Sequence, residues 1–254
     1  MKRALLLLTT MAFAVLLASG MAQAVINGQP DGNRHPYVGA AFTTEPFPLC
    51  SGTLISPKVF LTAGHCTYFF EQAQSRTFVT FEPQTDYTAE GTYTGTAHTH
   101  PDWNGLLYDV GVVVLDKPVE MASYGRLPRA NLVETLDMGD PLTLVGYGAA
   151  DFEVGGGQPL PTDWGVRSRA PVEFRGLDGA LSPDDMDTYF RLSGGSMGEA
   201  REGICFGDSG GPLLMPNQRT IVGVVSRASN PRCTASGYAQ RIDLPEVLAW
   251  VRSF

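Results

Sequence analysis

The 254-residue chain has little charge and no cluster of basic residues. Only 17% of its residues are Asp, Glu, Lys or Arg, and acidic side chains outnumber basic ones by 26 to 18. Nucleic acids and anionic membranes bind dense basic surfaces, so neither is expected as a partner. Low charge combined with 29 Gly and 18 Pro also disfavours a helical or disordered chain and favours a compact, turn-rich β protein.

Long apolar runs are absent beyond residue 24, and the one apolar stretch lies at the N-terminus. Residues 2–3 are basic, residues 4–18 are largely apolar, and residues 22–24 read Ala-Gln-Ala, a small-x-small cleavage site. This pattern predicts a signal peptide over residues 1–24 and a secreted protein that leaves the membrane after cleavage. A membrane anchor is the alternative, but the apolar stretch is short and two threonines interrupt it.

Cysteine is scarce, and the sequence contains no Cys-x-x-Cys pair. The missing pair argues against a zinc site, and an even number of cysteines in an exported chain indicates two disulfides. Reasoning from the residues alone leaves three pairings open. The His-x-His pair has no third ligand nearby in the sequence, so no metal or cofactor is predicted. The residues concerned are Cys50, Cys66, Cys205 and Cys233, and His98 and His100.

The remaining chain consists of many short segments rich in Val, Thr, Leu and aromatic residues, with Gly, Pro, Asn and Asp between them. This composition predicts β-strands joined by turns. One helix is predicted, at the C-terminus, with Asp243 as its cap and Pro245 in its first turn. The predicted strands cover residues 37–42, 52–56, 59–62, 77–81, 92–98 and 110–115, and then residues 142–147, 165–174, 188–192, 212–215, 220–226 and 237–241.

Three short motifs contain the side chains of a nucleophilic catalyst. His65 lies in Thr-Ala-Gly-His-Cys, Ser209 lies in Gly-Asp-Ser-Gly-Gly-Pro, and Asp109 opens an apolar segment between them. A serine hydroxyl is a poor nucleophile at neutral pH and needs an imidazole to accept its proton and a carboxylate to orient that imidazole. A turn serine, a core histidine and a strand-edge cap would each explain one residue, but their order and contexts together favour catalysis.

Together these motifs resemble those of the chymotrypsin-like (trypsin-fold) serine endopeptidases, over about residues 25–254. The resemblance implies an all-β fold of two perpendicular six-stranded antiparallel β-barrels with a C-terminal helix. The N-terminal barrel is then expected over residues 25–135, and the C-terminal barrel with the helix over residues 136–254. The resemblance also implies the disulfide pairings Cys50–Cys66 and Cys205–Cys233.

The resemblance assigns a role to each residue around the nucleophile. Ser209 attacks the peptide carbonyl, His65 acts as general base and then general acid, and Asp109 orients His65. The backbone N–H groups of Gly207 and Ser209 form an oxyanion hole, which stabilises the negative charge that develops on the carbonyl oxygen. Ser226 supports the aspartate and begins the strand that pairs with the substrate backbone.

The specificity pocket of the family can be placed on this sequence as well. Its floor falls on Gly203 and its walls on Ala228 and Ser236. An uncharged floor disfavours Lys and Arg substrates, and walls larger than glycine favour small or medium apolar side chains. Arg227 stands where the family usually has an aromatic residue. Together with Arg232 it either favours acidic groups a few residues before the cut or points to solvent.

Activation in this family depends on a new N-terminus that enters the protein. The matching segment begins at Val25, directly after the predicted cleavage site at Ala24, and Asn27 replaces a family glycine within it. The ammonium of Val25 would pair with Asp208, just before the nucleophile. Removal of the signal peptide alone is therefore expected to produce the active form.

Two other functions compete with this interpretation. A non-catalytic binding protein on the same fold would be expected to lose a triad member, whereas this chain keeps all three. An esterase of the α/β-hydrolase type would carry its serine before its histidine, the opposite of the order here. We expect a monomer whose partners are polypeptide substrates and protein protease inhibitors.

Overall fold

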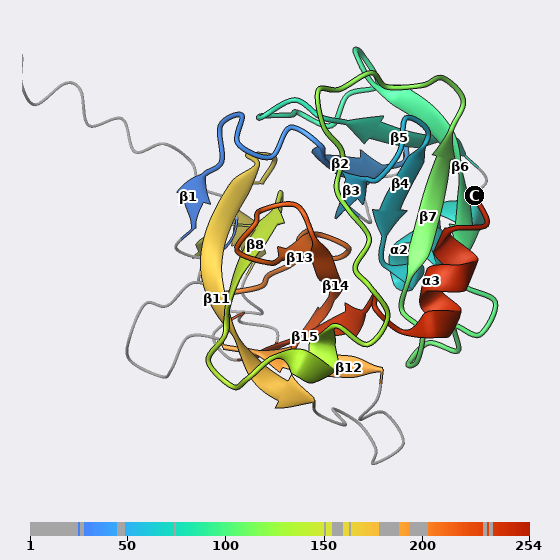
Figure 1. Ribbon diagram of the computed structural model, residues 1–254. Helices are drawn as coiled ribbons and strands as arrows, with labels where there is room; N and C mark the ends of the chain where they lie inside the picture. The colour runs from blue at the N-terminus through green and yellow to red at the C-terminus, as the bar shows by residue number, and fades with distance from the viewer. Residues whose placement is uncertain are drawn as a thin grey trace, which may run out of the picture.

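The computed structural model describes residue 25 and residues 28–44, 49–73, 75–149, 151–153, 160–162, 164–177, 188–193, 203–230, 233 and 236–254. Its strands form two closed barrels that lie beside each other (Figure 1). The predicted fold of two six-stranded antiparallel barrels with a C-terminal helix is confirmed. The predicted signal peptide, Asn27 and Arg232 lie outside the described residues.

The first barrel closes through strands in the order β2-β3-β4-β7-β6-β5. Its apolar interior is built largely by β4 and β7, where Phe60, Leu61 and Val112 are fully buried. The segment 110–115 was predicted as a strand, and within it only Val114 is partly exposed. The strands are β2 (Val38–Phe42), β3 (Cys50–Leu54), β4 (Val59–Thr62), β5 (Thr77–Thr80), β6 (Tyr93–Thr99) and β7 (Gly111–Leu115).

The second barrel closes where β11 pairs with β8 as well as with β12. Its separate core includes the fully buried Leu144, Phe190 and Val222. β1 (Gln29–Pro30) adds to β11, and β9 (Asp151–Glu153) and β10 (Leu160–Thr162) pair only with each other. The barrel strands are β8 (Pro141–Gly146), β11 (Ser168–Leu177), β12 (Tyr189–Leu192), β13 (Pro212–Leu214), β14 (Ile221–Ala228) and β15 (Gly237–Arg241).

The prediction of a single helix was wrong, because α2 (Gly64–Gln72) lies in the first barrel beside β6 and β7 (Figure 1). Its sequence carries no signal for a helix start, since Ala63 precedes it and makes no side-chain cap. Tertiary contacts hold it instead: Phe70 is buried in the core, and the Thr67 hydroxyl is hydrogen-bonded to that of Thr99 (2.9 Å). Packing therefore overrides weak local propensity in this segment.

The C-terminal helix α3 (Pro245–Val251) begins with proline, as predicted, and buries Val247 and Leu248 against the first barrel. The predicted cap was wrong, because no side chain caps this helix. The Asp243 carboxylate instead accepts a hydrogen bond from the backbone N–H of Val133 (2.8 Å), in the 3₁₀ helix η2 (Val133–Thr135), and pairs with Arg241 (2.9 Å). None of the helices within the described residues is long and apolar enough to cross a membrane.

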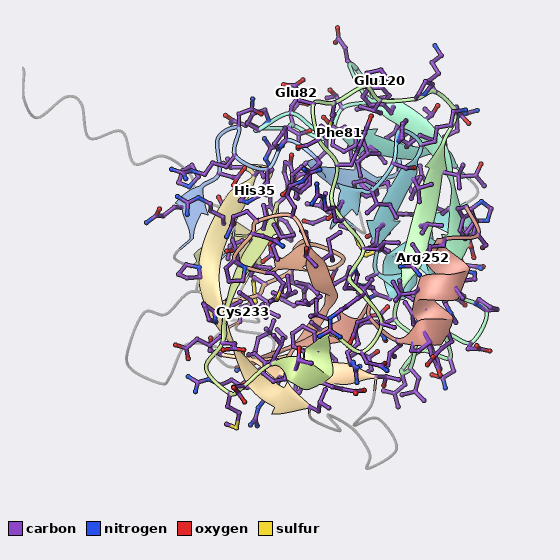
Figure 2. All side chains as sticks on the ribbon, in the orientation of Figure 1. His35, Phe81, Glu82, Glu120, Cys233 and Arg252 are labelled. Carbon is purple, nitrogen blue, oxygen red and sulfur yellow. A yellow bond between two sulfur atoms is a disulfide. The ribbon has the colours of Figure 1, made fainter. Side chains whose placement is uncertain are left out.

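A fully buried arginine joins the two barrels. Arg167, just before β11, donates hydrogen bonds to the carbonyl oxygens of Val38 (3.0 Å) and Phe81 (2.9 Å) in the first barrel. Its Nε also contacts the Asp31 carboxylate (3.2 Å), which in turn binds the ring of His35. His35 is buried in this cluster and labelled in Figure 2. These bonds fix the second barrel against the first.

Candidate active site

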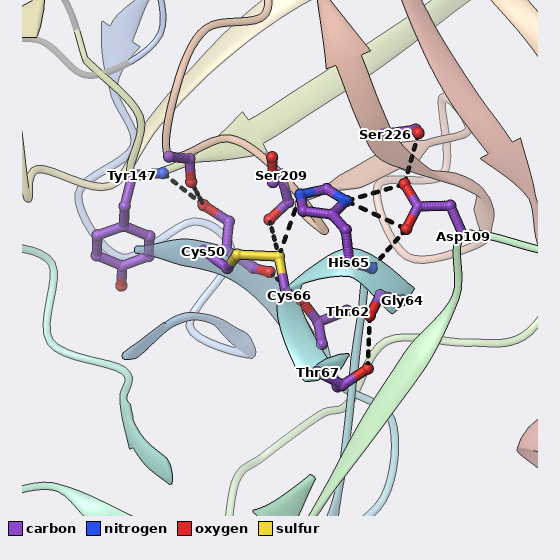
Figure 3. Close-up of a disulfide and its surroundings, with 12 residues drawn as sticks. Cys50, Thr62, Gly64, His65, Cys66, Thr67, Asp109, Tyr147, Ser209 and Ser226 are labelled. Atoms are coloured by element: carbon purple, nitrogen blue, oxygen red, sulfur yellow. Dashed lines mark hydrogen bonds and ion pairs between the residues drawn. A yellow bond between two sulfur atoms is a disulfide. The ribbon is translucent and has the colours of Figure 1, made fainter. Parts of the chain in front are cut away.

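His65 is placed by the junction between β4 and α2. It lies in the first turn of α2, and its backbone N–H donates to Asp109 Oδ1 at 2.7 Å. The ring Nδ1 lies 2.9 Å from Asp109 Oδ2 and 3.1 Å from Oδ1 (Figure 3). The Cys50–Cys66 disulfide, which the resemblance implied, ties this turn to β3. The imidazole is therefore held through Nδ1, and its other ring nitrogen, Nε2, lies 3.6 Å from Cys66 Sγ.

The buried Asp109 carboxylate accepts hydrogen bonds from both His65 and Ser226. The Ser226 hydroxyl donates to its Oδ2 at 2.5 Å, and its own backbone N–H donates to Gln240 Oε1 at 2.9 Å. Burial would raise the pKa of Asp109, but the charge of His65 and the hydrogen bonds from His65 and Ser226 hold it below its usual value. Asp109 is therefore an anion at neutral pH.

The contact with Asp109 also changes the pKa of the His65 imidazole. Burial favours the neutral ring, but the charge of Asp109 and its hydrogen bond outweigh burial and raise the pKa of His65 above its usual value. The charge of Arg227 acts against this increase. The ring is thus a stronger base than a free histidine, and its side chain is still 26% exposed.

The loop that carries Ser209 is tied to the first barrel through Ser51. The Ser51 backbone N–H donates to the Ser209 carbonyl oxygen (2.8 Å), and its hydroxyl donates to the Gly207 carbonyl oxygen (2.7 Å). Gly207 has a φ of +91°, and a Cβ there would lie 2.9 Å from Gly148 Cα, so only glycine fits without strain. The predicted oxyanion donors thus lie in a loop whose backbone is tightly held.

A pocket of about 400 Å³ opens beside His65 and Ser209. Among the described residues no hydrogen bond joins the Ser209 hydroxyl to His65, although both residues line this pocket. Ser226 and Ala228 line it as well, whereas Gly203 and Ser236 are not among its lining residues. The other lining residues are Ile204, Cys205, Phe206, Val225, Arg227, Ser229, Asn230 and Cys233.

The sequence prediction placed Ala228 in the pocket wall but missed Ile204, which also lines the pocket. Ala228 pairs with Gly237 across β14 and β15, and neither Gly237 nor the predicted wall residue Ser236 is among the residues that line the pocket. A Cβ on Gly237 would lie 1.9 Å from Ile204 Cδ1, so the Ile204 side chain lies directly over that glycine. Its place beside Gly203 in the serine loop was the available signal in the sequence.

The family model described as Trypsin matches residues 25–251 of this chain. The chain belongs to the trypsin family. It is 26% identical to a trypsin of Sarcophaga bullata, over 96% of this chain and 94% of that protein. It is 28% identical to a vitellin-degrading protease of Bombyx mori over 70% of this chain, and the match spans 65% of that protein.

A solved structure titled HL collagenase aligns with a TM-score of 0.71 over 90% of this chain and 97% of its own, at 21% identity, which shows the shared fold. Family membership makes this chain a serine endopeptidase.

The second disulfide that the resemblance implied, Cys205–Cys233, is also present and joins the serine loop to the segment after β14.

The two histidines that were considered as metal ligands pack against aromatic rings. His98 packs on Phe254, and His100 stacks on Tyr108. Among the described residues, the one group of three residues with metal-ligating atoms close together is Cys50, His65 and Cys66. Its two sulfurs form a disulfide and are not free thiolates.

Asp208 is fully buried behind the serine loop. Its carboxylate accepts hydrogen bonds from the backbone N–H groups of Gly148 (3.0 Å) and Cys205 (2.9 Å), and within the described residues no cation pairs with it. Burial raises the pKa of Asp208 to about 7. Val25 is also fully buried, in the core of the second barrel, and has a φ of +67°. No hydrogen bond or ion pair links Val25 to Asp208 within the described part of the chain.

The raised pKa of His65 predicts the acid limb of the pH profile. His65 must be neutral to accept a proton, so kcat/KM should be low in acid and rise with pH, with a midpoint above about 6.5, the value of a free histidine. Replacing Asp109 with Asn should shift this midpoint downwards and reduce kcat by about 10⁴-fold, because it removes the charge and the tautomer control. Measuring kcat/KM from about pH 5 to about pH 9 tests this; a wild-type midpoint at or below that of free histidine contradicts it.

Proposed function

We propose that this protein is a secreted endopeptidase that cleaves peptide bonds through Ser209, His65 and Asp109. The observation that carries the proposal is the buried Asp109 carboxylate, 2.9 Å from His65 Nδ1, beside a pocket that His65 shares with Ser209. Ser209 Oγ attacks the peptide carbonyl while His65 accepts its proton. His65 then gives that proton to the leaving amine, and water hydrolyses the acyl-enzyme by the same route.

Two groups of donors support these steps. The backbone N–H groups of Gly207 and Ser209 are proposed to bind the negative oxygen of the tetrahedral intermediate, where loss of one donor typically costs about 10²–10³ in rate. Ser226, through its hydrogen bond to Asp109, keeps the carboxylate aligned with the imidazole. The catalytic roles of these residues rest on the geometry described above and on the family of the chain.

Replacement of the nucleophile tests the mechanism. Ser209→Ala and His65→Ala should each lower kcat by at least about 10⁴-fold, because the triad acts as a unit. Hydrolysis of a peptide substrate and labelling by a serine-directed phosphonylating probe are measured, with circular dichroism to show that each variant folds. Ser253→Ala, an exposed serine at the C-terminus, is the matched control and should behave as wild type. A Ser209→Ala variant that keeps more than about a hundredth of the activity contradicts the mechanism, and a wild type that neither cleaves nor labels supports the non-catalytic alternative.

We propose that the residue before the cut is small or medium-sized and apolar. Ile204, Val225 and Ala228 give the pocket apolar walls, and no carboxylate is among its lining residues within the described chain. A substrate Lys or Arg would therefore enter without a partner for its charge, which is unfavourable in a buried site. The Ile204 side chain over Gly237 also limits the depth available to an aromatic ring.

A peptide-library digest with cut sites identified by mass spectrometry tests this specificity. Wild type should cut mainly after small or medium apolar residues. Ile204→Ala removes the side chain that lies over Gly237, so the share of cuts after Phe, Tyr and Leu should rise. Shares within one digest do not depend on how much of the variant is folded. A wild-type digest dominated by cuts after Lys or Arg contradicts the proposal.

We propose further that cleavage after Ala24 activates the protein. A free amine on Val25 would supply the cation that buried Asp208 lacks in the described chain, and pairing stabilises a buried carboxylate. The pair favours the ammonium, so its pKa rises above the usual value of an α-amine. The active form is then favoured below that raised pKa and lost as pH rises through it.

Comparison of two N-termini tests the activation step. Protein beginning at Val25 should be at least about tenfold more active than protein that keeps Ala24, since only a free Val25 amine can reach Asp208. In Asp208→Asn the two forms should differ little, because the anion is gone; this variant is the control. Equal kcat/KM for the two wild-type forms contradicts the idea.

Secretion, partners and oligomeric state complete the proposal. The sequence pattern of residues 1–24 supports export, and the two disulfides fit an oxidising compartment. Polypeptides are the substrates, protein protease inhibitors are expected partners, and the protein is expected to act as a monomer.

A further inference from the structure

Arg227 places a cation in the wall of the active-site pocket. It follows Ser226 in β14, and it lines the same pocket as His65 and Ser209. Its charge opposes the rise in the pKa of His65 that Asp109 causes. The family usually has an aromatic residue at this position, so Arg227 gives the pocket of this chain an additional positive charge.

Two tyrosine rings hold the guanidinium in place. The Arg227 Cζ atom lies 4.7 Å from the centre of the Tyr189 ring and 5.8 Å from that of Tyr238. Tyr238 pairs with Arg227 across β14 and β15, and Tyr189 is fully buried, with its hydroxyl donating to the Leu106 carbonyl oxygen. Stacking on rings of this kind suits the planar guanidinium and limits its freedom. The cation therefore occupies a fixed place before a substrate arrives.

This guanidinium lacks the anionic partner that the two fully buried arginines have. Arg167 pairs with Asp31, and Arg241 pairs with Asp243. Arg227 makes no salt bridge within the described residues, and its Nη2 is buried there without a hydrogen bond. Asp109, the carboxylate of the nearby triad, is already bound to His65 and Ser226. A buried guanidinium nitrogen without an acceptor favours a ligand that brings one.

We propose that Arg227 makes the enzyme select peptides with Asp or Glu a few residues before the cleaved bond; this rests on the proposed peptide hydrolysis. Arg227 and Ala228 both line the pocket, but neighbouring residues of a strand point to opposite faces, so their side chains face different parts of it. The acidic residue is therefore a neighbour of the residue that enters the apolar pocket. Arg227 is only partly buried, and a carboxylate can bind its fork with paired, charge-assisted hydrogen bonds.

Paired peptides test the selection directly. Each pair has the same apolar residue before the cut and differs only by Glu or Gln at the second, third or fourth position before it. Wild type should show a kcat/KM for the Glu peptide about tenfold above that for the Gln peptide at one of these positions, which equals about 1.4 kcal/mol. Higher salt should reduce this ratio, because salt screens a partly exposed charge pair.

Three variants assign the ratio to Arg227. Arg227→Gln should bring it close to one, and Arg227→Lys should keep part of it, since a lysine retains the charge without the fork. Arg252→Gln, which removes the same charge from the exposed end of α3 (Figure 2), is the matched control and should keep the wild-type ratio. A ratio of two peptides on one enzyme sample is independent of the folded fraction.

Several results overturn the inference. These are a wild-type ratio near one at all three positions, an acidic preference only after the cut, or an unchanged ratio in Arg227→Gln. In each of these the peptides are still cleaved, so the proposed function stands. Failure of wild type to cleave any peptide, together with failure of the phosphonylating probe to label Ser209, removes the proposed function and this inference with it.

Discussion

The buried carboxylate of Asp109 is the group on which the rest of the site depends. It lies just before β7 in the first barrel and binds His65 from the same barrel. The second barrel contributes Ser226, which donates to the carboxylate, and Gln240, which accepts the backbone N–H. The Asp109 carboxylate thus orients the His65 ring, and its hydrogen bonds form only when the two barrels keep this relative position. A small rotation between the barrels would leave a buried charge with too few donors.

The serine side of the site shows the same dependence on contacts between barrels. Ser209 belongs to the second barrel's chain segment, yet its carbonyl oxygen is held by Ser51 of the first. Arg167 adds bonds between the barrels at a distance from the catalytic residues. The disulfide Cys50–Cys66 then fixes the turn that carries His65. Each proposed catalytic group is therefore positioned by bonds to the opposite barrel or by a covalent link, rather than by its own loop alone.

The buried charged side chains fall into two groups, those with a partner of opposite charge in the described chain and those without one. Arg167 and Arg241 each have a carboxylate partner within the described chain, so their charges are satisfied in the folded protein. Asp208 and Arg227 have no such partner there, and both lie close to the reacting serine in sequence or in space. The first is complemented in our proposal by a new N-terminus and the second by a substrate. Both would release favourable electrostatic energy only when the correct group arrives.

Local patterns in the amino-acid sequence predicted a β protein and most of its strands, because short apolar segments lie between turn residues; the bounds of β4 and β15 agree with the prediction. The arrangement in two barrels was implied by the resemblance to the chymotrypsin-like family. The sequence also predicted the three residues of the proposed triad, because the residues around each one form distinctive motifs. It could not reveal α2, which is stabilised by packing rather than by its own residues, nor the position of Ile204 over Gly237. The rings around Arg227 were equally hidden, since they come from separate strands. Only the closure of the barrels brings such distant segments together, and long-range packing of this kind has no local signature in a sequence.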